Sequence, residues 1–237
     1  MAEGRRLGWW GVPGAAAGVL AGSWIAQAGH SVSPLASWAA VAAAGFAAAL
    51  VALDRRAAGA REGATDFIVF AGTVMGTTAA MLVGGAAVAV ALAAFALAAW
   101  LTTIGRGHPV RRFAEAALLG LPLAYGALAT EHAARGLLPW ALASWLVAVR
   151  GLADDVGREP GLRGAAIALA LGFVLASLVL PARAGYGAPY FLVAMLAQMS
   201  VLAAATRLIV GRPERLTPLV NVAIAGELVA LVVGRVA

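Results

Sequence analysis

The chain contains no cysteine and no lysine among its 237 residues, and charged residues of either sign are scarce. The absence of cysteine excludes disulfide bonds, thiolate metal sites and cysteine nucleophiles. Charged residues make up 12% of the sequence and hydrophobic residues 62%, against about 25% and about 45–50% in a soluble domain. With a mean hydropathy of +0.90, this composition indicates an integral membrane protein.

Several motifs of soluble proteins are missing as well. The sequence has no glycine-rich phosphate loop, no zinc-ligand spacing and no serine-nucleophile elbow. All basic residues are arginine, and the net charge is +6, a balance that in a soluble protein can indicate nucleic-acid binding. Here the arginines stand in short segments between apolar runs. Lipid phosphates and membrane topology therefore explain them, and we expect no nucleic-acid partner.

Nine apolar runs predict transmembrane helices, each of which needs about 20 mostly apolar residues to cross a bilayer. The predicted spans are residues 9–28, 35–53, 67–84, 86–104, 113–130, 137–149 with a polar extension, 165–180, 189–209 and 216–236. The third and fourth are separated only by Gly84-Gly85, because residues 67–104 carry no charge and are long enough for two helices. We therefore predict an all-α, polytopic membrane protein with one transmembrane domain over residues 1–237. Its many Ala and Gly residues suit close helix packing.

The arginines divide unevenly between the two sides that nine helices define. Fourteen of the 17 fall on the side of the N-terminus, namely Arg5, Arg6, Arg55, Arg56, Arg61, Arg106, Arg111, Arg112, Arg150, Arg158, Arg163, Arg207, Arg212 and Arg215. The other side has Arg135, Arg183 and Arg235. Because arginine accumulates in cytoplasmic segments, we expect a cytoplasmic N-terminus and an outer C-terminus in an inner or plasma membrane. The first run lacks a convincing cleavage site and is expected to remain as a helix.

Two cytoplasmic segments combine acids with arginines. Residues 53–66 follow the second span, and residues 150–159 follow the sixth. Carboxylates at the ends of two helices could face each other and hold Mg²⁺. Water molecules and substrate phosphates usually supply the remaining ligands of this ion. Nearby arginines could bind diphosphate oxygens in pairs. The alternative is that these side chains only solvate loops and pair with one another.

A third cytoplasmic segment, residues 102–112, is purely basic. It could hold a phosphate, or its arginines could serve only to fix the topology and contact lipid.

Polar residues within the spans are few. Glu115 lies one turn from Arg111 and Arg112, which predicts an ion pair between residues four apart. Glu227 stands in the middle of the last span. It is either a functional acid that faces the bundle interior or a neutral acid hydrogen-bonded to a neighbouring helix.

This order of features resembles the UbiA superfamily of intramembrane prenyltransferases over nearly the whole chain. The best local match, residues 102–159, holds the basic turn 106–112, then Gly120-Leu-Pro-Leu-Ala-Tyr125-Gly126, then Trp145-Leu-Val-Ala-Val-Arg150-Gly-Leu-Ala-Asp154-Asp155-Val-Gly157-Arg158. Against the family's Arg-Asp-x-x-Asp-x-x-Gly-Asp run, Arg150, Asp154 and Gly157 match, whereas Gly151 and Arg158 replace aspartates. The first motif, Leu53-Asp54-x-x-Ala57-x-x-x-Arg61, keeps one acid of three.

The resemblance implies transfer of an isoprenyl group from its diphosphate to a lipophilic acceptor in a cavity open to membrane lipids. On this reading Asp54 and Asp154 are catalytic, and Asp54, Asp154 and Asp155 hold Mg²⁺. The residues that bind the diphosphate are then Arg106, Arg111, Arg112, Arg150 and Arg158.

Three points stay open. The chain could be a terpene cyclase that uses no separate acceptor, or a non-catalytic UbiA-like membrane protein that binds a lipid or a partner. The lost aspartates also leave open that arginine, rather than metal, holds the diphosphate.

Overall fold

The computed structural model of the protein describes residues 11–27, 31–57, 63–101, 109–156, 159–212 and 216–236. These residues form nine α-helices and two 3-10 helices, and they contain no β-strand. The helices are α1 (Gly11–Ala26), α2 (Pro34–Ala57), α3 (Gly63–Val83), α4 (Gly85–Leu101), α5 (Pro109–Leu128), η1 (Ala133–Gly136), α6 (Leu137–Val156), η2 (Pro160–Leu162), α7 (Arg163–Arg183), α8 (Ala188–Val210) and α9 (Leu216–Val236). The all-α prediction is confirmed for this part of the chain.

Among the described residues, six helices are long and apolar enough to cross a bilayer. They are α2, α3, α6, α7, α8 and α9. Helices α1 and α4 are apolar but shorter, and α5 carries Arg111, Arg112 and Glu115 in its first two turns. The protein is therefore an integral, multi-pass membrane protein, whereas nine membrane crossings stay a prediction.

The break predicted at Gly84-Gly85 separates α3 from α4. Helix α3 ends at Val83 and α4 begins at Gly85, so a single residue joins them. Gly84 has a φ of 140°, a conformation that residues with a Cβ rarely adopt. The long uncharged run is therefore two helices because glycine allows the backbone to turn sharply between them.

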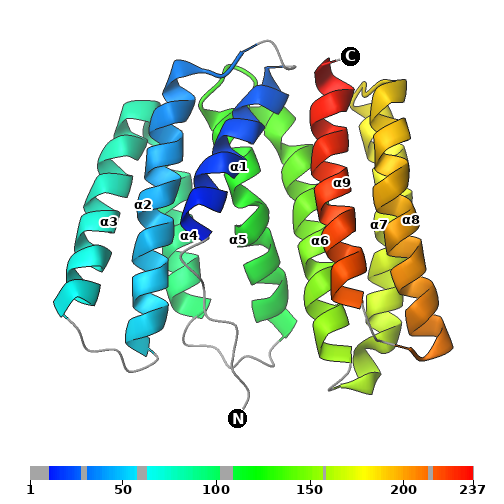
Figure 1. Cartoon of the computed structure of the whole chain (residues 1–237). Coiled ribbons are helices and arrows are strands. Elements are labelled where there is room, and N and C mark those ends of the chain that lie inside the picture. Colours follow the sequence, from blue (N-terminus) through cyan, green and yellow to red (C-terminus); the bar gives the residue numbers. More distant parts are fainter. Residues whose placement is uncertain are drawn as a thin grey trace.

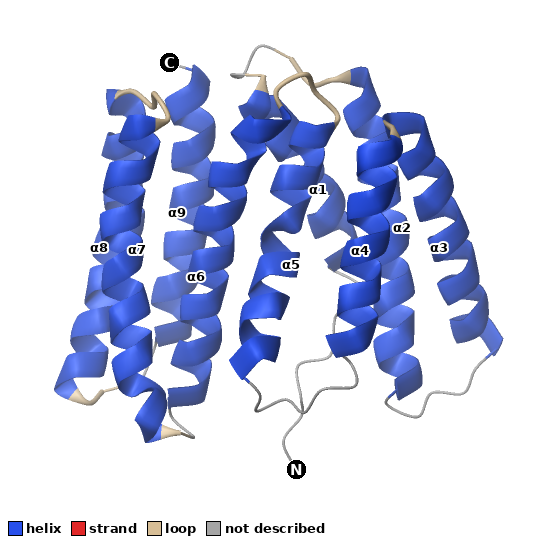
Figure 2. Cartoon of the chain, turned by 180° about the vertical axis from the view of Figure 1, so that it is seen from behind, coloured by secondary structure: helices blue, strands red, loops and turns tan. Residues whose placement is uncertain are grey.

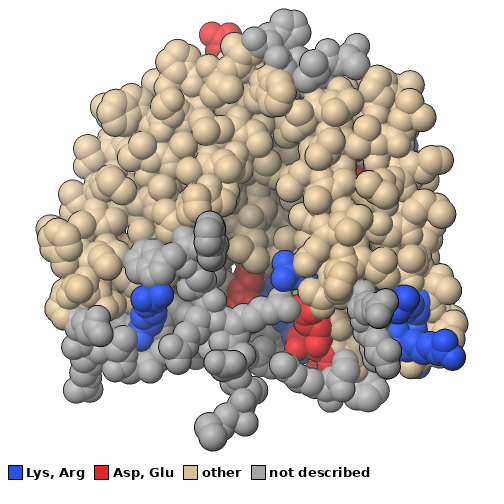
Figure 3. All heavy atoms as spheres, in the orientation of Figure 1, with Lys and Arg blue, Asp and Glu red and all other residues tan. Residues whose placement is uncertain are grey.

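The helices form two groups that stand side by side (Figure 1). Helices α1–α5 make up one group and α6–α9 the other, and the view from behind shows the same division (Figure 2). Helix α5 packs on both α1 and α6 and joins the groups, while α1 meets α9 at only a few positions. The face between α1 and α9 is hollowed, and acidic and basic atoms gather near the lower end of this hollow (Figure 3).

Glycine allows helices α1 and α5 to approach each other closely. A Cβ added to Gly22 would overlap the carbonyl oxygen of Leu123, and one added to Gly126 would overlap the carbonyl oxygen of Val19. The two backbones can touch here only because these side chains are absent. The prediction that small residues permit close packing is confirmed at this crossing.

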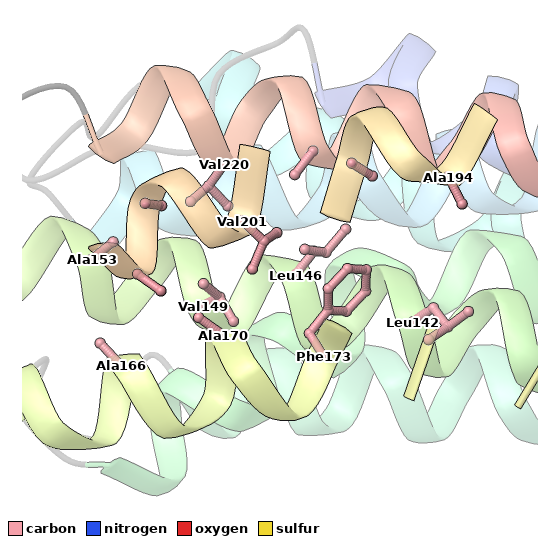
Figure 4. Close-up of a cluster of buried hydrophobic side chains, with 14 of the residues drawn as sticks. Leu142, Leu146, Val149, Ala153, Ala166, Ala170, Phe173, Ala194, Val201 and Val220 are labelled. Atoms are coloured by element: carbon pink, nitrogen blue, oxygen red, sulfur yellow. The ribbon is translucent and has the colours of Figure 1, made fainter. Parts of the chain in front are cut away.

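The second group of helices packs around a core of apolar side chains (Figure 4). This core includes Phe173 of α7, Leu142 and Leu146 of α6, and Val201 of α8, all fully buried. Lipid tails are as apolar as these side chains, so close packing rather than expulsion of water holds such helices together. The same core fixes α6 and therefore the position of the polar residues at its end.

The polar segment after residue 149 is more helical than the sequence analysis predicted. Helix α6 continues to Val156, so Arg150, Asp154 and Asp155 lie on its last two turns and not in a loop. Helix α2 likewise continues past residue 53 and includes Asp54. Helices can extend beyond their apolar stretch because their terminal polar side chains reach water while the backbone stays hydrogen-bonded.

Most arginines of the described residues gather at the end of the bundle where α2 and α6 end. Helices α2 and α6 end at the lower side of the bundle and α9 ends at the upper side (Figure 1), and basic atoms lie along the lower edge on the face that Figure 3 shows. The helix ends place Arg55, Arg111, Arg112, Arg150, Arg163, Arg207 and Arg212 at this lower end, and Arg135 and Arg183 at the opposite end. This division agrees with the predicted one. Which end faces the cytoplasm stays a prediction.

Candidate functional site

The last two turns of α6 carry the candidate site. Asp154 and Asp155 are consecutive, so their side chains leave the helix about 100° apart and meet different neighbours. Asp155 pairs with a residue of α5, whereas Asp154 bonds to a residue of α9. Each of the two acids thus ties the end of α6 to a different helix.

Arg112 of α5 bridges two acids. Its Nε lies 3.2 Å from Oδ2 of Asp155, and its Nη2 donates a hydrogen bond of 3.5 Å to Oε2 of Glu159. The side chain of Arg112 is 13% exposed, and its Nε is buried and makes no aligned hydrogen bond within the described chain. A guanidinium group has five N–H donors, so Arg112 keeps donors for a further anion.

Asp154 is held from the other direction. The hydroxyl of Thr217, in the first turn of α9, donates a hydrogen bond to Oδ1 of Asp154. Asp154 is half-buried, so this bond restricts a carboxylate that would otherwise rotate freely. Thr217 could not be identified from the sequence, because a threonine at the start of a helix is an ordinary feature and nothing in its segment points to α6.

Arg150 lies one turn before Asp154 on the same face of α6. Its side chain is half-buried, and its Nε is buried with no hydrogen-bond partner among the residues that the structure describes. A buried N–H of a charged group without a partner costs free energy, about 1–3 kcal/mol or more. An anionic ligand would supply the missing acceptor.

The ion pair predicted between Arg111 and Glu115 is confirmed. Nε of Arg111 lies 2.6 Å from Oε1 of Glu115, one turn along α5. The pair is partly exposed at its Glu115 end, so we expect a contribution to stability of well under about 1 kcal/mol. Arg111 therefore has a local partner, which Arg150 lacks within the described chain.

The structure describes some of the predicted site residues and not others. The structure brings Arg112, Asp155, Arg150 and Asp154 to the same end of the α5–α6 pair. Arg106 and Arg158 lie outside the described residues. The backbone of Asp54 is described as part of α2, but its side chain is not, so a meeting of Asp54 with Asp154 stays a prediction.

The described acids do not by themselves form a Mg²⁺ site. Nowhere in the described chain do three side chains of His, Cys, Asp or Glu come together as a metal site requires. Asp154 and Asp155 face different helices, and each already has a protein partner. Mg²⁺ prefers about six oxygen ligands in near-octahedral geometry. The predicted magnesium site thus depends on Asp54, whose side chain is not described.

A second polar cluster lies inside the α7–α9 group. The hydroxyl of Tyr190 lies 2.7 Å from Oε1 of Glu227 and 3.0 Å from the carbonyl oxygen of Ser177, and Gln198 donates a hydrogen bond to Oγ of Ser177. Glu227 is 1% exposed. Glu227 therefore bonds to a neighbouring helix, as one of the two alternatives from the sequence has it, and a functional role of this acid stays open. This cluster is tied to helix packing because its four residues come from α7, α8 and α9.

The fold is shared with a protein of known structure. The chain matches the apo structure of a UbiA homolog from Aeropyrum pernix K1 with a TM-score of 0.69, over 94% of each chain. Sequence identity is 18%, so this likeness establishes the fold alone. No family model and no curated protein matches the sequence. The resemblance found in the sequence is therefore confirmed as a UbiA-like fold.

Proposed function

We propose that this chain is a UbiA-like intramembrane prenyltransferase that moves an isoprenyl group from its diphosphate to a lipophilic acceptor. The observation that carries the proposal is the pair of guanidinium groups, Arg112 and Arg150, at one end of the α5–α6 pair. Arginine binds phosphate oxygens through two parallel N–H donors, which suits a diphosphate. The surrounding helices are apolar, as the isoprenyl chain requires of its neighbours.

The reaction needs little covalent help from the protein. The bond between the allylic carbon and the diphosphate oxygen breaks, and its electron pair leaves with the diphosphate. Arg112 and Arg150 stabilise the negative charge that develops on this leaving group. The acceptor then forms a bond to the allylic carbon and releases a proton, while apolar side chains keep water from capturing the cation.

The remaining predicted residues belong to the same proposal. Asp154, which Thr217 holds, and Asp54 would be the catalytic acids, with Asp155 beside them. Arg106, Arg111 and Arg158 would add positive charge around the diphosphate. This places the headgroup site at the arginine-rich end of the bundle, which we propose to be cytoplasmic in an inner or plasma membrane.

A second function is favoured by the pairing of the acids. Asp155 is neutralised by Arg112, and Asp154 accepts a hydrogen bond from Thr217, so both acids also serve to tie helices together. A non-catalytic UbiA-like protein that binds a lipid would use the same residues structurally. Catalysis and lipid binding differ in whether the bond to the diphosphate is broken.

The deciding experiment measures diphosphate release. Purified protein in lipid nanodiscs receives Mg²⁺, radiolabelled farnesyl or geranylgeranyl diphosphate and a membrane lipid extract as acceptor source. We expect free diphosphate together with label in the lipid fraction. Diphosphate release accompanied by a cyclic hydrocarbon and no labelled acceptor would indicate a terpene cyclase. If neither substrate releases diphosphate, the enzyme proposal is wrong and the non-catalytic, lipid-binding function is favoured.

Two variants test the site itself. Arg150→Gln should slow release about 10- to 100-fold, the effect expected for loss of a hydrogen bond to a charged group. Arg183→Gln removes an exposed arginine at the opposite end of α7 and serves as the matched control. Equal slowing by both variants would contradict the assignment of the headgroup to the α5–α6 end.

A further inference from the structure

The end of α6 already contains a cation that is part of the chain. Arg112 comes from α5, lies 3.2 Å from Asp155, and also reaches Glu159 at 3.5 Å. A divalent ion on Asp155 would compete with this guanidinium group for the carboxylate. It would weaken the pairing of Asp155 with Arg112, whose side chain is 13% exposed, and would place a second cation close to it.

The same end of α6 has capacity for an anion. The Nε of Arg150 is buried and has no partner in the described chain, and Arg112 uses only part of its donors on Asp155 and Glu159. Both side chains are at least partly screened from water, so a phosphate oxygen that reaches either guanidinium group would accept charge-assisted hydrogen bonds. The sequence points the same way, since Gly151 and Arg158 stand where the resembling family has aspartates.

We infer that the diphosphate headgroup is held by guanidinium groups, with Arg112 taking the place of a metal at Asp155, and that this binding does not require a divalent ion. The inference rests on the proposed function, because it concerns the same headgroup site. It extends that function by naming what neutralises the headgroup. In a metal-bridged site Asp155 attracts the ligand through the ion. In an arginine site Asp155 competes with the ligand for Arg112.

This difference makes Asp155→Asn diagnostic. The amide is of nearly the same size and removes the negative charge that Arg112 now faces. In an arginine site the variant should bind the headgroup severalfold more tightly, because Asp155 no longer offsets the positive charge of Arg112 or repels the diphosphate. In a metal-bridged site the same variant should bind more weakly, because a ligand of the ion is lost.

The test is equilibrium binding of farnesyl thiolodiphosphate, an analogue that ionises slowly, to the full chain in nanodiscs of neutral lipid. Binding is measured with EDTA and with Mg²⁺, and inorganic diphosphate is added as competitor. We expect affinities within about twofold of each other in the two conditions, and displacement by inorganic diphosphate in EDTA. Arg150→Gln should weaken binding about 10- to 100-fold in EDTA.

The outcomes separate the two proposals. Binding that needs Mg²⁺, or weaker binding by Asp155→Asn, overturns the arginine site but keeps the proposed function. An absence of binding in both conditions overturns the proposed function and the inference with it. Arg112→Gln removes a contact between α5 and α6, so its binding result counts only if the variant keeps the wild-type unfolding temperature. Arg150→Gln and Asp155→Asn distinguish the arginine site from the metal-bridged site without the Arg112 variant.

Discussion

The hydroxyl of Thr217 donates a hydrogen bond to Oδ1 of Asp154, although the two residues are 63 positions apart. The bond connects the first turn of α9 to the last two turns of α6. It gives the one acid that matches a family aspartate in the second motif a defined orientation. Thr217 is therefore a positioning residue for Asp154 in the proposed reaction.

Replacement of this hydroxyl tests the positioning role. Thr217→Val keeps the shape but removes the donor, which should lower kcat for diphosphate release about 10- to 100-fold and leave KM within about threefold. Thr217→Ser restores the hydroxyl and should recover most of the rate. An equal loss in both variants, or a loss that appears only in KM, would show that Thr217 acts through packing alone.

The Tyr190–Glu227 pair predicts which replacements α9 tolerates. The Tyr190 hydroxyl has one proton and two oxygen neighbours, Glu227 and the carbonyl oxygen of Ser177. When the proton goes to the carbonyl, a neutral Glu227 completes the arrangement by donating its own proton to the hydroxyl oxygen. An uncharged acid also avoids the cost of a lone charge inside the bundle.

We therefore expect Glu227→Gln to change the free energy of unfolding by less than about 1 kcal/mol, because the amide can donate in the same way. Glu227→Ala should cost about 2–4 kcal/mol, since it leaves a cavity and takes a partner from the Tyr190 hydroxyl. Unfolding in detergent, followed by circular dichroism, measures both. A glutamine variant as unstable as the alanine variant would indicate that a charged Glu227 is required.

The contact of α1 with α5 predicts a strong effect of side-chain size. Gly126→Val places a side chain where the carbonyl oxygen of Val19 lies, so the two helices must separate. We expect a loss of about 1–3 kcal/mol or more in the free energy of unfolding, the usual cost of overpacking. Gly14→Ala on α1, with no atom within 4 Å of the new Cβ, is the control and should be nearly neutral. Similar stabilities for the two variants would contradict the close crossing.

The proposed orientation can be checked with reporters fused to the chain ends. The arginine-rich end should lie in the cytoplasm, so an N-terminal fluorescent protein should fluoresce and a C-terminal alkaline phosphatase should be active. If alkaline phosphatase is active when fused to the N-terminus and inactive when fused to the C-terminus, the orientation is the reverse of the proposed one. Inactivity of the phosphatase at both ends would contradict an odd number of crossings.

Features that depend on residues near in sequence were predictable. The turn at Gly84, the ion pair of Arg111 with Glu115 and the gathering of arginines at one end follow from short-range rules of backbone conformation, helix period and alternating direction. The extension of α6 to Val156 was harder to predict from the sequence. Charged residues usually mark the end of a membrane span, but the helix itself can continue past them.

The partners of the polar residues could not be predicted in the same way. Asp155 pairs with Arg112, and Tyr190 reaches Glu227, across helices that are distant in sequence. Helices α8 and α9 are apolar on nearly all faces, so hydrophobic periodicity does not indicate that Tyr190 turns toward Glu227. Helices α5 and α6 have a polar end, but the order of their charges does not indicate which acid meets which arginine.

The sequence alone determined that this chain is a helical membrane protein with its arginines on one side, because bilayer thickness and the cost of charge in lipid act on composition and order. It also contained enough of the motif around Arg150 and Asp154 to indicate a UbiA-like fold. Only the tertiary structure decided that Asp155 faces the guanidinium group of Arg112 and that Thr217 orients Asp154. Those pairings depend on the rotation and depth of each helix, which close packing at positions such as Gly126 sets.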